Sequence, residues 1–496
     1  MFPKDFLFGC SMSGFQFEMG ANGDPDERSD WYIWVRAPVN LISGTVSGDL
    51  PEHGTGYWKN FSRIHDLAEL AGMNTLRVGI EWSRVFPYPT FEAPVKVIID
   101  EDNRVTSMDI DISGLKEMEK LANLEALEHY REILLDLKKR GFTVIVDLSH
   151  FTLPIWIHDP IAVNRGEKTD ATGWVNVRTV VEFAKYATFM AWKLDDIVDM
   201  WSTMNEPQIV SQLGYLTTRA GFPPAYFSPR MYIHSLINQA QAHARAYDAM
   251  KKFTRKPVGV IYSFTWIDLL EDNKEVKESA ERFHNWEFMD MITEGNVYGT
   301  FRDDMKHRLD FIGVNYYTRT VIKPLQTPFD MDGYTMTWQV LPGYGYSSSP
   351  QGIALSGRPT SDMGWEIYPE GLYGVLSKLQ RRYNLPMIVT ENGIADHRDA
   401  LRPYFLIAHL HAVEKALEDG IDVRGYLHWS LVDNYEWAQG FKMRFGLVHA
   451  EFPARSYTPR PSYYLYQKLI AERSVEPFLP LIKYPYDMWG DNLFLT

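Results

Sequence analysis

Two glutamates stand at the ends of short apolar segments, each beside an asparagine. The segments read MWSTMNEP, which contains Asn205 and Glu206, and PMIVTENG, which contains Glu391. Because proline or glycine interrupts the chain directly afterwards, each carboxylate is expected at a strand end. Two such carboxyl groups facing one cleft can cleave a glycosidic bond, one as a protonated acid and one as an ionised nucleophile or base. Either glutamate alone could be a solvated loop residue or a cap, but the pair favours the chemistry.

Other reaction classes lack their sequence signatures. The chain contains no HExxH, no cysteine pair, no GxGxxG, no GxxxxGK[ST] and no GxSxG. The nearest histidine pair, His409 and His411, falls in a predicted helix at a spacing that separates the two faces. We therefore expect no metal site and no cofactor.

Composition excludes several partners. The chain has 496 residues, with 50 Lys and Arg against 64 Asp and Glu, and this net charge of −14 argues against nucleic acid. Cys10 is the single cysteine, which fits a reducing compartment. Lys4 and Asp5 interrupt the apolar residues at the start of the sequence, so we expect no signal peptide there, and no apolar run reaches membrane-spanning length. We expect a cytoplasmic protein with no membrane partner and a neutral substrate.

Short apolar segments alternate with helix-period segments along the chain. Near-continuous apolar runs such as Thr143-Val-Ile-Val146 are typical of parallel strands that are buried on both faces. The predicted strands are Phe6–Cys10, Thr75–Ile80, Thr143–Leu148, Val198–Met204, Val258–Phe264, Phe311–Tyr316, Met387–Thr390 and Gly425–Trp429. Length alone suggests about three domains, but eight β/α alternations without a linker indicate one α/β domain over 1–496. The predicted fold is a (β/α)₈ TIM barrel.

Three long segments rich in turn residues exceed a minimal barrel. They cover 24–55, 88–112 and 318–365, and each follows a strand, so we expect loops at the carboxyl ends of the strands, where barrel active sites lie. The tail 474–496 ends in WGDNLFLT. We expect it to pack on its own barrel, with a subunit contact as the alternative.

Several motifs together carry a family resemblance. Besides T-M-N-E-P and I-V-T-E-N-G, the chain contains F-Q-F-E (15–18), L-R-V-G-I-E-W-S-R (76–84), G-V-N-Y-Y (313–317) and H-W-S-L-V-D-N-Y-E-W (428–437). From Phe6 to about Pro461 it resembles glycoside hydrolase family 1, the retaining β-glycosidases, and within that family the archaeal β-glucosidase/β-galactosidase type.

The resemblance implies a role for each central residue. Glu391 matches the nucleophile and Glu206 the acid/base. Arg77 and Tyr317 match residues that hydrogen-bond the nucleophile, and a cation with a hydroxyl donor there would favour the ionised form of Glu391. Either could instead be a packing or ion-pair residue of the core.

The resemblance also implies a subsite for the glycone, the sugar that is released. Its residues are Gln16, His150, Asn205, Trp429 and Glu436, with Trp437 and Phe151 as further stacking surfaces. Trp429 could alternatively be a core tryptophan, and His150 a structural histidine. The family usually has tryptophan where Phe151 stands, and phenylalanine lacks the indole N–H, so the preferred glycone stays open.

The resulting hypothesis is an exo-β-glycosidase that hydrolyses β-D-glucosides and β-D-galactosides by double displacement, with transglycosylation as a side reaction. A β-mannosidase or β-fucosidase of the same family is the nearest alternative; an endo-glycanase and a non-catalytic sugar-binding barrel are further rivals. Family members that cleave 6-phosphoglycosides carry Ser where Glu436 stands, and Lys and Tyr where Met443 and Phe445 stand, so the resemblance implies unphosphorylated sugars. Archaeal relatives suggest a homo-oligomer, either a tetramer or a dimer.

Overall fold

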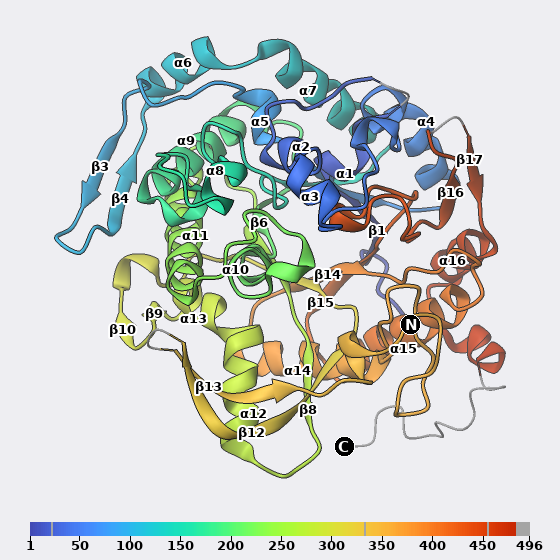
Figure 1. Cartoon of the computed structure of the whole chain (residues 1–496). Coiled ribbons are helices and arrows are strands. Elements are labelled where there is room, and N and C mark those ends of the chain that lie inside the picture. The colour runs from blue at the N-terminus through green and yellow to red at the C-terminus, as the bar shows by residue number, and fades with distance from the viewer. Residues whose placement is uncertain (21–22, 332–333, 454–455, 483–496) are drawn as a thin grey trace.

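The computed structural model describes residues 1–20, 23–331, 334–453 and 456–482. Its centre is a closed barrel of parallel strands in the order β1-β15-β14-β11-β7-β6-β5-β2 (Figure 1). These strands are β1 (Leu7–Met12), β2 (Thr75–Gly79), β5 (Thr143–Asp147), β6 (Met200–Asn205), β7 (Val258–Ser263), β11 (Ile312–Asn315), β14 (Met387–Asn392) and β15 (Val423–His428). The predicted (β/α)₈ barrel and its eight strands are confirmed.

Helices connect the strands and surround the barrel (Figure 1). The longer ones are α4 (Tyr57–Leu70), α7 (Leu124–Lys139), α9 (Val177–Leu194), α11 (Pro229–Met250), α14 (Pro369–Tyr383), α15 (Arg402–Glu418) and α16 (Pro461–Glu472). Shorter ones are α1 (Gly14–Phe17), α2 (Asp30–Trp34), α3 (Pro38–Ile42), α5 (Trp82–Val85), α6 (Ile112–Leu121), α8 (Pro160–Asn164), α10 (Pro207–Tyr215), α12 (Lys274–Glu281) and α13 (Glu287–Thr293).

Helix α7 shows how the sequence sets such boundaries. The side chain of Asn123 accepts a hydrogen bond from the amide of Ala126 and caps the first turn. After the last helical residue, Gly141 adopts φ +84°, a left-handed conformation that glycine allows without a Cβ clash. Gly141 therefore stands just past the end of α7.

The barrel interior is filled toward the amino ends of the strands. Ile145, Phe311, Ile388 and Leu427 are buried there in one apolar cluster. Because the apolar side chains occupy this end, polar residues at the carboxyl ends of the strands are left to line a cavity.

The three segments predicted as loops contain regular structure. Segment 24–55 holds α2 and α3, and 318–365 holds β12 (Arg319–Met331) and β13 (Tyr334–Val340), which form a sheet with β8 (Trp266–Leu269). The long insertions expected in these segments therefore include short helices and strands. Two smaller pairs of strands are β9 (Asn296–Val297) with β10 (Thr300–Phe301), and β16 (Val448–Ala450) with β17 (Tyr457–Pro459).

Segment 88–112 also differs from its predicted position. It forms a hairpin of β3 (Lys96–Ile99) and β4 (Val105–Asp109) that projects at the left edge of Figure 1. Arg245 of α11 donates to the carbonyl of Val105 at 2.9 Å, and Val105 and Met108 are buried. The hairpin packs on α9 and α11 and contributes no residue to the cavity, because its apolar face is satisfied by the helices.

The described end of the chain packs on the barrel's own helices. Ser474 donates to Glu414 of α15 at 3.0 Å, and Val475 and Phe478 are buried. This agrees with the expected packing for 474–482, whereas 483–496, including WGDNLFLT, lie outside the described residues. Among the helices of the described residues, none has the length and hydrophobicity to cross a membrane.

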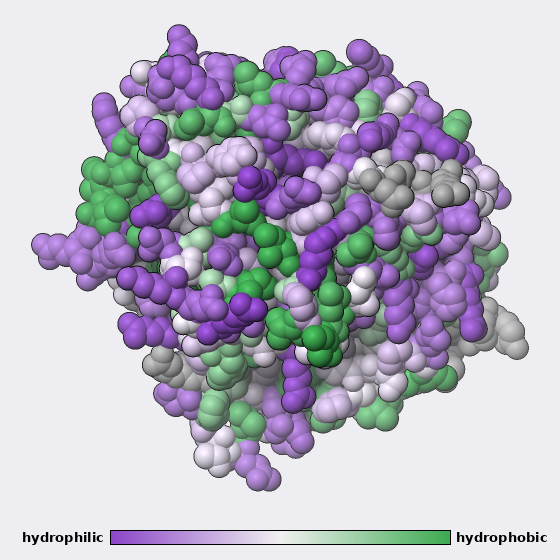
Figure 2. Space-filling view, turned by 45° about the horizontal axis from the view of Figure 1, so that its top comes forward, coloured by the Kyte–Doolittle hydropathy of each residue, from purple (hydrophilic) through white to green (hydrophobic). Residues whose placement is uncertain are grey.

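The outer surface is mixed in character. Hydrophilic residues cover most of the face shown in Figure 2, and hydrophobic residues emerge in separate patches. The exposed apolar side chains include Ile42, Ile98, Phe227 and Phe301. We infer from the closed barrel that the described chain is one domain.

Candidate active site

A cavity of about 500 Å³ opens at the carboxyl ends of the barrel strands. It is lined by every residue that the sequence assigned to the site except Arg77, namely Gln16, His150, Phe151, Asn205, Glu206, Tyr317, Glu391, Trp429, Glu436 and Trp437. Asn205 is the last residue of β6 and Glu391 lies one residue before the end of β14. The barrel therefore gathers residues from distant parts of the chain.

Glu391 is held by two donors. Nη2 of Arg77 donates to Oε1 at 2.5 Å, and the hydroxyl of Tyr317 donates to Oε2 at 2.6 Å. Arg77 is fully buried, and its Nη1 also lies 3.3 Å from Oδ1 of Asn205. Two donors on a buried carboxyl stabilise its charged form and fix its orientation.

Glu206 stands in a different environment. It begins α10 with a left-handed backbone at φ +49°, which directs its side chain into the cavity rather than along the helix. Burial, together with the negative charge of Glu391, raises the pKa of Glu206 to about 8. The two carboxyls thus differ as an acid and a nucleophile must: one is solvated by donors and one is favoured to keep its proton.

Asn315, the last residue of β11, was missed as a site residue. Its amide nitrogen donates to Oε1 of Glu206 at 2.7 Å and to Oδ1 of Asn205 at 3.0 Å. The available signal was its position in the G-V-N-Y-Y motif, two residues before Tyr317 at a strand end. The side-chain amide of Asn315 therefore links Glu206 to Asn205.

Gln16 and Glu436 lie next to each other in the cavity lining. Nε2 of Gln16 donates to Oδ1 of Asn434 at 3.1 Å and to the carbonyl of Tyr435 at 3.0 Å, and it lies 3.5 Å from Oε2 of Glu436. Burial and the charge of Glu391 raise the pKa of Glu436 to about 8. Such a carboxyl can accept or donate when polar groups enter the cavity.

Aromatic rings form the neighbouring wall. The rings of Trp429 and Trp437 lie nearly parallel to that of His150, with centroids 5.8 Å and 5.9 Å away. Phe151 contacts Trp437 at 4.9 Å between centroids and has a left-handed backbone at φ +73°. The predicted stacking residues therefore meet at one side of the cavity.

Both ring nitrogens of His150 have protein partners. Nδ1 lies 3.1 Å from Oδ2 of Asp147, and Nε2 lies 3.2 Å from Nδ2 of Asn205. The carboxylate of Asp147 favours a proton on Nδ1, which makes Nε2 an acceptor toward the Asn205 amide. A polar group that enters here would replace the Asn205 contact.

The sequence profile described as glycosyl hydrolase family 1 matches residues 1–96 and 116–475. The chain belongs to glycosyl hydrolase family 1. This confirms the resemblance and identifies the protein as a glycoside hydrolase.

Relatives of this family 1 hydrolase match over nearly their whole lengths. A β-galactosidase of Sulfolobus acidocaldarius is 49% identical over 479 residues, which cover 96% of each chain. The crystal structure of the β-glycosidase from the hyperthermophile Thermosphaera aggregans has 46% identity and a TM-score of 0.92, covering 97% of this chain and 99% of that one. A β-glucosidase mutant derived from a hyperthermophilic tetrameric structure has 48% identity and a TM-score of 0.88, covering 97% and 98%.

The lining of the hydrolase's cavity also includes apolar residues. Among them are Ile209, Phe222, Met363 and Trp365, and Trp365 contacts Tyr317 at 5.2 Å between ring centroids. Met363 and Trp365 come from segment 318–365, which was expected at this face. Met363 and Trp365 could not be identified from the sequence, because strands β12 and β13 separate them from β11 along the chain.

The structure also locates the residues of segment 440–446 that bear on 6-phosphate binding. Phe445 lines the cavity and Met443 is buried, whereas Lys442 is exposed and does not line the cavity. Arg77 is buried and paired with Glu391. The cavity lining therefore contains no lysine or arginine among the described residues.

Proposed function

We propose that this glycoside hydrolase is a retaining exo-β-glycosidase that removes terminal β-D-glucosyl and β-D-galactosyl residues. The supporting observation is the contrast between two carboxyls of one cavity: Glu391 receives donors from Arg77 and Tyr317, while the pKa of Glu206 is raised to about 8. The β-galactosidase and β-glucosidase names of the relatives support the choice of glycones.

The first step follows from these environments. Glu206, protonated at neutral pH, donates its proton to the glycosidic oxygen as the C1–O bond breaks. A carboxylate oxygen of Glu391 attacks C1 and forms a glycosyl-enzyme ester. Arg77 and Tyr317 hold that carboxylate in position before attack.

The second step reuses the same groups. Once Glu391 is esterified, its negative charge is lost, and the pKa of Glu206 falls because that charge had helped to raise it. Glu206 can then accept a proton from water, which attacks C1 and releases the sugar with its original configuration. A sugar hydroxyl in place of water gives transglycosylation.

Gln16, Glu436, His150 and Asn205 are proposed to bind the glycone hydroxyls, with Trp429 beneath the ring. We expect Gln16 and Glu436 to bound the glycone end of the cavity, so that single sugars are released from a chain end. The apolar lining residues that include Trp365 would receive the leaving group.

The class of reaction can be tested by following the products. With an aryl β-glucoside, NMR during the first minutes should show the β-anomer of glucose before mutarotation. With cello-oligosaccharides, glucose should be released from the start. Early appearance of the α-anomer, or cleavage in the middle of the chain, would contradict the proposal. A preference for β-mannosides or β-fucosides would support the alternative glycones.

The assembly is proposed to be a homo-oligomer, either a tetramer or a dimer. The tetrameric origin named for one relative and the exposed apolar patches support this. The lone Cys10, which is buried, supports a cytoplasmic location. Light scattering coupled to gel filtration tests the assembly, and a monomer at micromolar concentration would contradict it.

A further inference from the structure

Glu81 is a buried carboxyl that the reaction steps above do not use. It directly precedes α5 and has 1% of its surface exposed. Although it occupies the N-cap position, its side chain makes no hydrogen bond to the amides of its own helix. N-cap residues are normally Ser, Thr, Asp or Asn, so the reason for this glutamate is to be sought in contacts outside its own helix.

Its two carboxyl oxygens serve two different segments of the cavity wall. Oε1 accepts from the amide of Phe15 at 2.8 Å, and Oε2 accepts from the hydroxyl of Thr152 at 2.5 Å. Phe15 directly precedes Gln16, and Thr152 lies two residues after His150. One carboxyl thus joins the segment that carries Gln16 to the turn that carries His150.

The fit around this carboxyl is close. A Cβ on Gly14 would lie 2.4 Å from Oε1 of Glu81, so only glycine lets α1 approach the carboxyl this closely. On the other side, Phe151 has φ +73°, a conformation that surrounding contacts must maintain. Thr152 holds the turn through Glu81, and Leu153 holds it through Asp30, whose Oδ1 accepts from the Leu153 amide at 2.9 Å.

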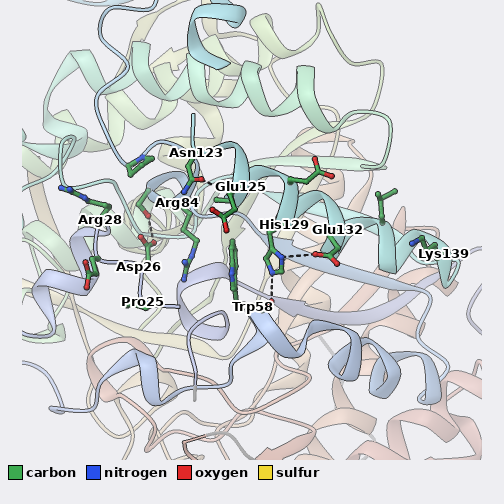
Figure 3. A pocket seen from close by; sticks show the side chains of 16 residues that line it. Pro25, Asp26, Arg28, Trp58, Arg84, Asn123, Glu125, His129, Glu132 and Lys139 are labelled. Atoms are coloured by element: carbon green, nitrogen blue, oxygen red, sulfur yellow. Dashed lines mark hydrogen bonds and ion pairs between the residues drawn. The ribbon is translucent and has the colours of Figure 1, made fainter. Parts of the chain in front are cut away.

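A charged cluster supports Glu81 from behind. Its amide donates to the hydroxyl of Tyr130 at 3.0 Å, which in turn donates to Glu18 at 2.6 Å, and Glu18 also pairs with Arg84. Arg84 and Asp26 line a surface groove of about 1130 Å³, where Figure 3 shows both side chains. The cluster therefore lies between this groove and the segments that carry Gln16 and His150.

The electrostatics favour a neutral Glu81. Burial, followed by the negative charges of Glu18 and Asp26, raises the pKa of Glu81 well above its ordinary value. A neutral glutamic acid and a glutamine have similar shapes, and each offers one acceptor and one donor. In the neutral acid, Oε1 still accepts from the Phe15 amide, and the proton on Oε2 can be donated to Thr152 across the same 2.5 Å contact. Glutamine could keep both contacts in the same way, with Thr152 as the acceptor.

We propose that Glu81 is a positioning residue that holds segments 14–17 and 150–152 at the spacing needed to discriminate between glycones. The inference rests on the proposed glycone role of Gln16 and His150. If this spacing relaxes, the enzyme loses the extra transition-state stabilisation that correctly placed hydroxyls provide.

The test compares two threonines that donate to buried glutamates at the same distance. The hydroxyl of Thr152 is hydrogen-bonded to Glu81 at 2.5 Å. The hydroxyl of Thr90 is hydrogen-bonded at 2.5 Å to Glu182, which lies on α9 and away from the cavity lining. Thr152→Val and its matched control Thr90→Val each remove one hydroxyl at nearly constant volume. Glu81→Gln and Glu81→Ala complete the set.

The readout is the ratio of kcat/KM for a parent aryl β-glycoside to that for its deoxy analogues with the same leaving group. Thr152→Val and Glu81→Ala should lower the parent kcat/KM by about tenfold or more. The parent-to-deoxy ratio should shrink because the deleted hydroxyl is no longer correctly held. Glu81→Gln should keep the parent kcat/KM and the parent-to-deoxy ratio at their wild-type values. Thr90→Val should lower the melting temperature without changing the ratio.

Wild-type kcat/KM and wild-type parent-to-deoxy ratios in folded Thr152→Val would overturn the proposal, whatever the melting temperature. If Glu81→Ala does not fold, Thr152→Val and Glu81→Gln still decide the question. Failure of the wild-type enzyme to cleave any β-glycoside would instead contradict the proposed function, so the two failures are distinguishable.

Discussion

The amide of Asn315 donates a 2.7 Å hydrogen bond to Oε1 of Glu206. Its own orientation is set, because Oδ1 of Asn315 accepts from the hydroxyl of Thr390 at 2.8 Å. The amide is thus presented as a donor, which stabilises the charged form of Glu206 and opposes the effect of burial on its pKa. Asn315 therefore tunes the proposed acid/base.

Removal of this donor should shift the pH profile. Glu206 must be protonated in the first step, so kcat/KM should fall as the pH rises through its pKa of about 8. In Asn315→Leu the pKa should rise, and the alkaline limb should move up by about one pH unit, since a hydrogen bond to a charged group contributes about 1.5–3 kcal/mol. An unchanged limb, or one at lower pH, would contradict this tuning; Glu206→Gln is the control that should lose the limb.

Loss of the proposed nucleophile should be rescued chemically. Glu391→Gly removes the group that forms the ester and should abolish hydrolysis of aryl glycosides. Azide or formate can enter the vacated space and attack C1 directly, which should restore activity and give a product of inverted configuration. The product is identified by NMR. Rescue by azide in Glu206→Gly with the same inverted product would reverse the two assignments.

Loss of the proposed acid should depend on the leaving group. Glu206→Ala should reduce cleavage of natural glycosides by about 10²- to 10⁴-fold, because their leaving oxygen needs a proton. Formation of the glycosyl-enzyme from dinitrophenyl glycosides should be spared, because that group leaves without protonation. Pre-steady-state burst measurements separate the two steps. Equal losses for both classes of substrate would be inconsistent with an acid role.

Glu436 should select against phosphorylated sugars. The cavity lining offers no lysine or arginine to balance a 6-phosphate among the described residues, and Lys442 lies outside it. Above its pKa of about 8, Glu436 would also repel the phosphate. The wild-type enzyme should strongly prefer β-glucosides to their 6-phosphates, and Glu436→Ser should narrow that preference by about tenfold, mainly through slower cleavage of the unphosphorylated sugar. Ratios of kcat/KM for the two sugars provide the check. A wild-type enzyme that prefers the phosphorylated substrate would exclude this interpretation.

Phe151 offers a stacking surface without an N–H donor. Phe151→Trp should add a hydrogen bond to one glycone hydroxyl and lower KM by up to about tenfold, as a net contribution of about 0.5–1.5 kcal/mol implies. The gain should vanish with the deoxy sugar that lacks this hydroxyl. Phe151→Leu, which removes the ring that contacts Trp437, should raise KM instead. An identical gain for every deoxy sugar would indicate packing rather than hydrogen bonding.

The barrel and the two glutamates could be predicted from local information, whereas the other site residues were implied by the family resemblance. Eight apolar strands separated by helix-period segments leave few other ways to bury both faces of each strand. Glu206 and Glu391 end two of these strands, and strand ends of a barrel share one face. Their convergence on one cavity therefore follows from the order of elements along the chain.

The tertiary structure decided what depends on distant contacts. The hairpin within 88–112 packs on α9 and α11 and contributes no residue to the cavity, although the sequence placed this segment at the active-site face. Asn315 acquired its importance from its distance to Glu206, and Glu81 from its two partners, Phe15 and Thr152. Local patterns specify strands and helices, since those depend on neighbours in sequence, whereas hydrogen bonds between segments dozens to hundreds of residues apart exist only once the barrel has closed.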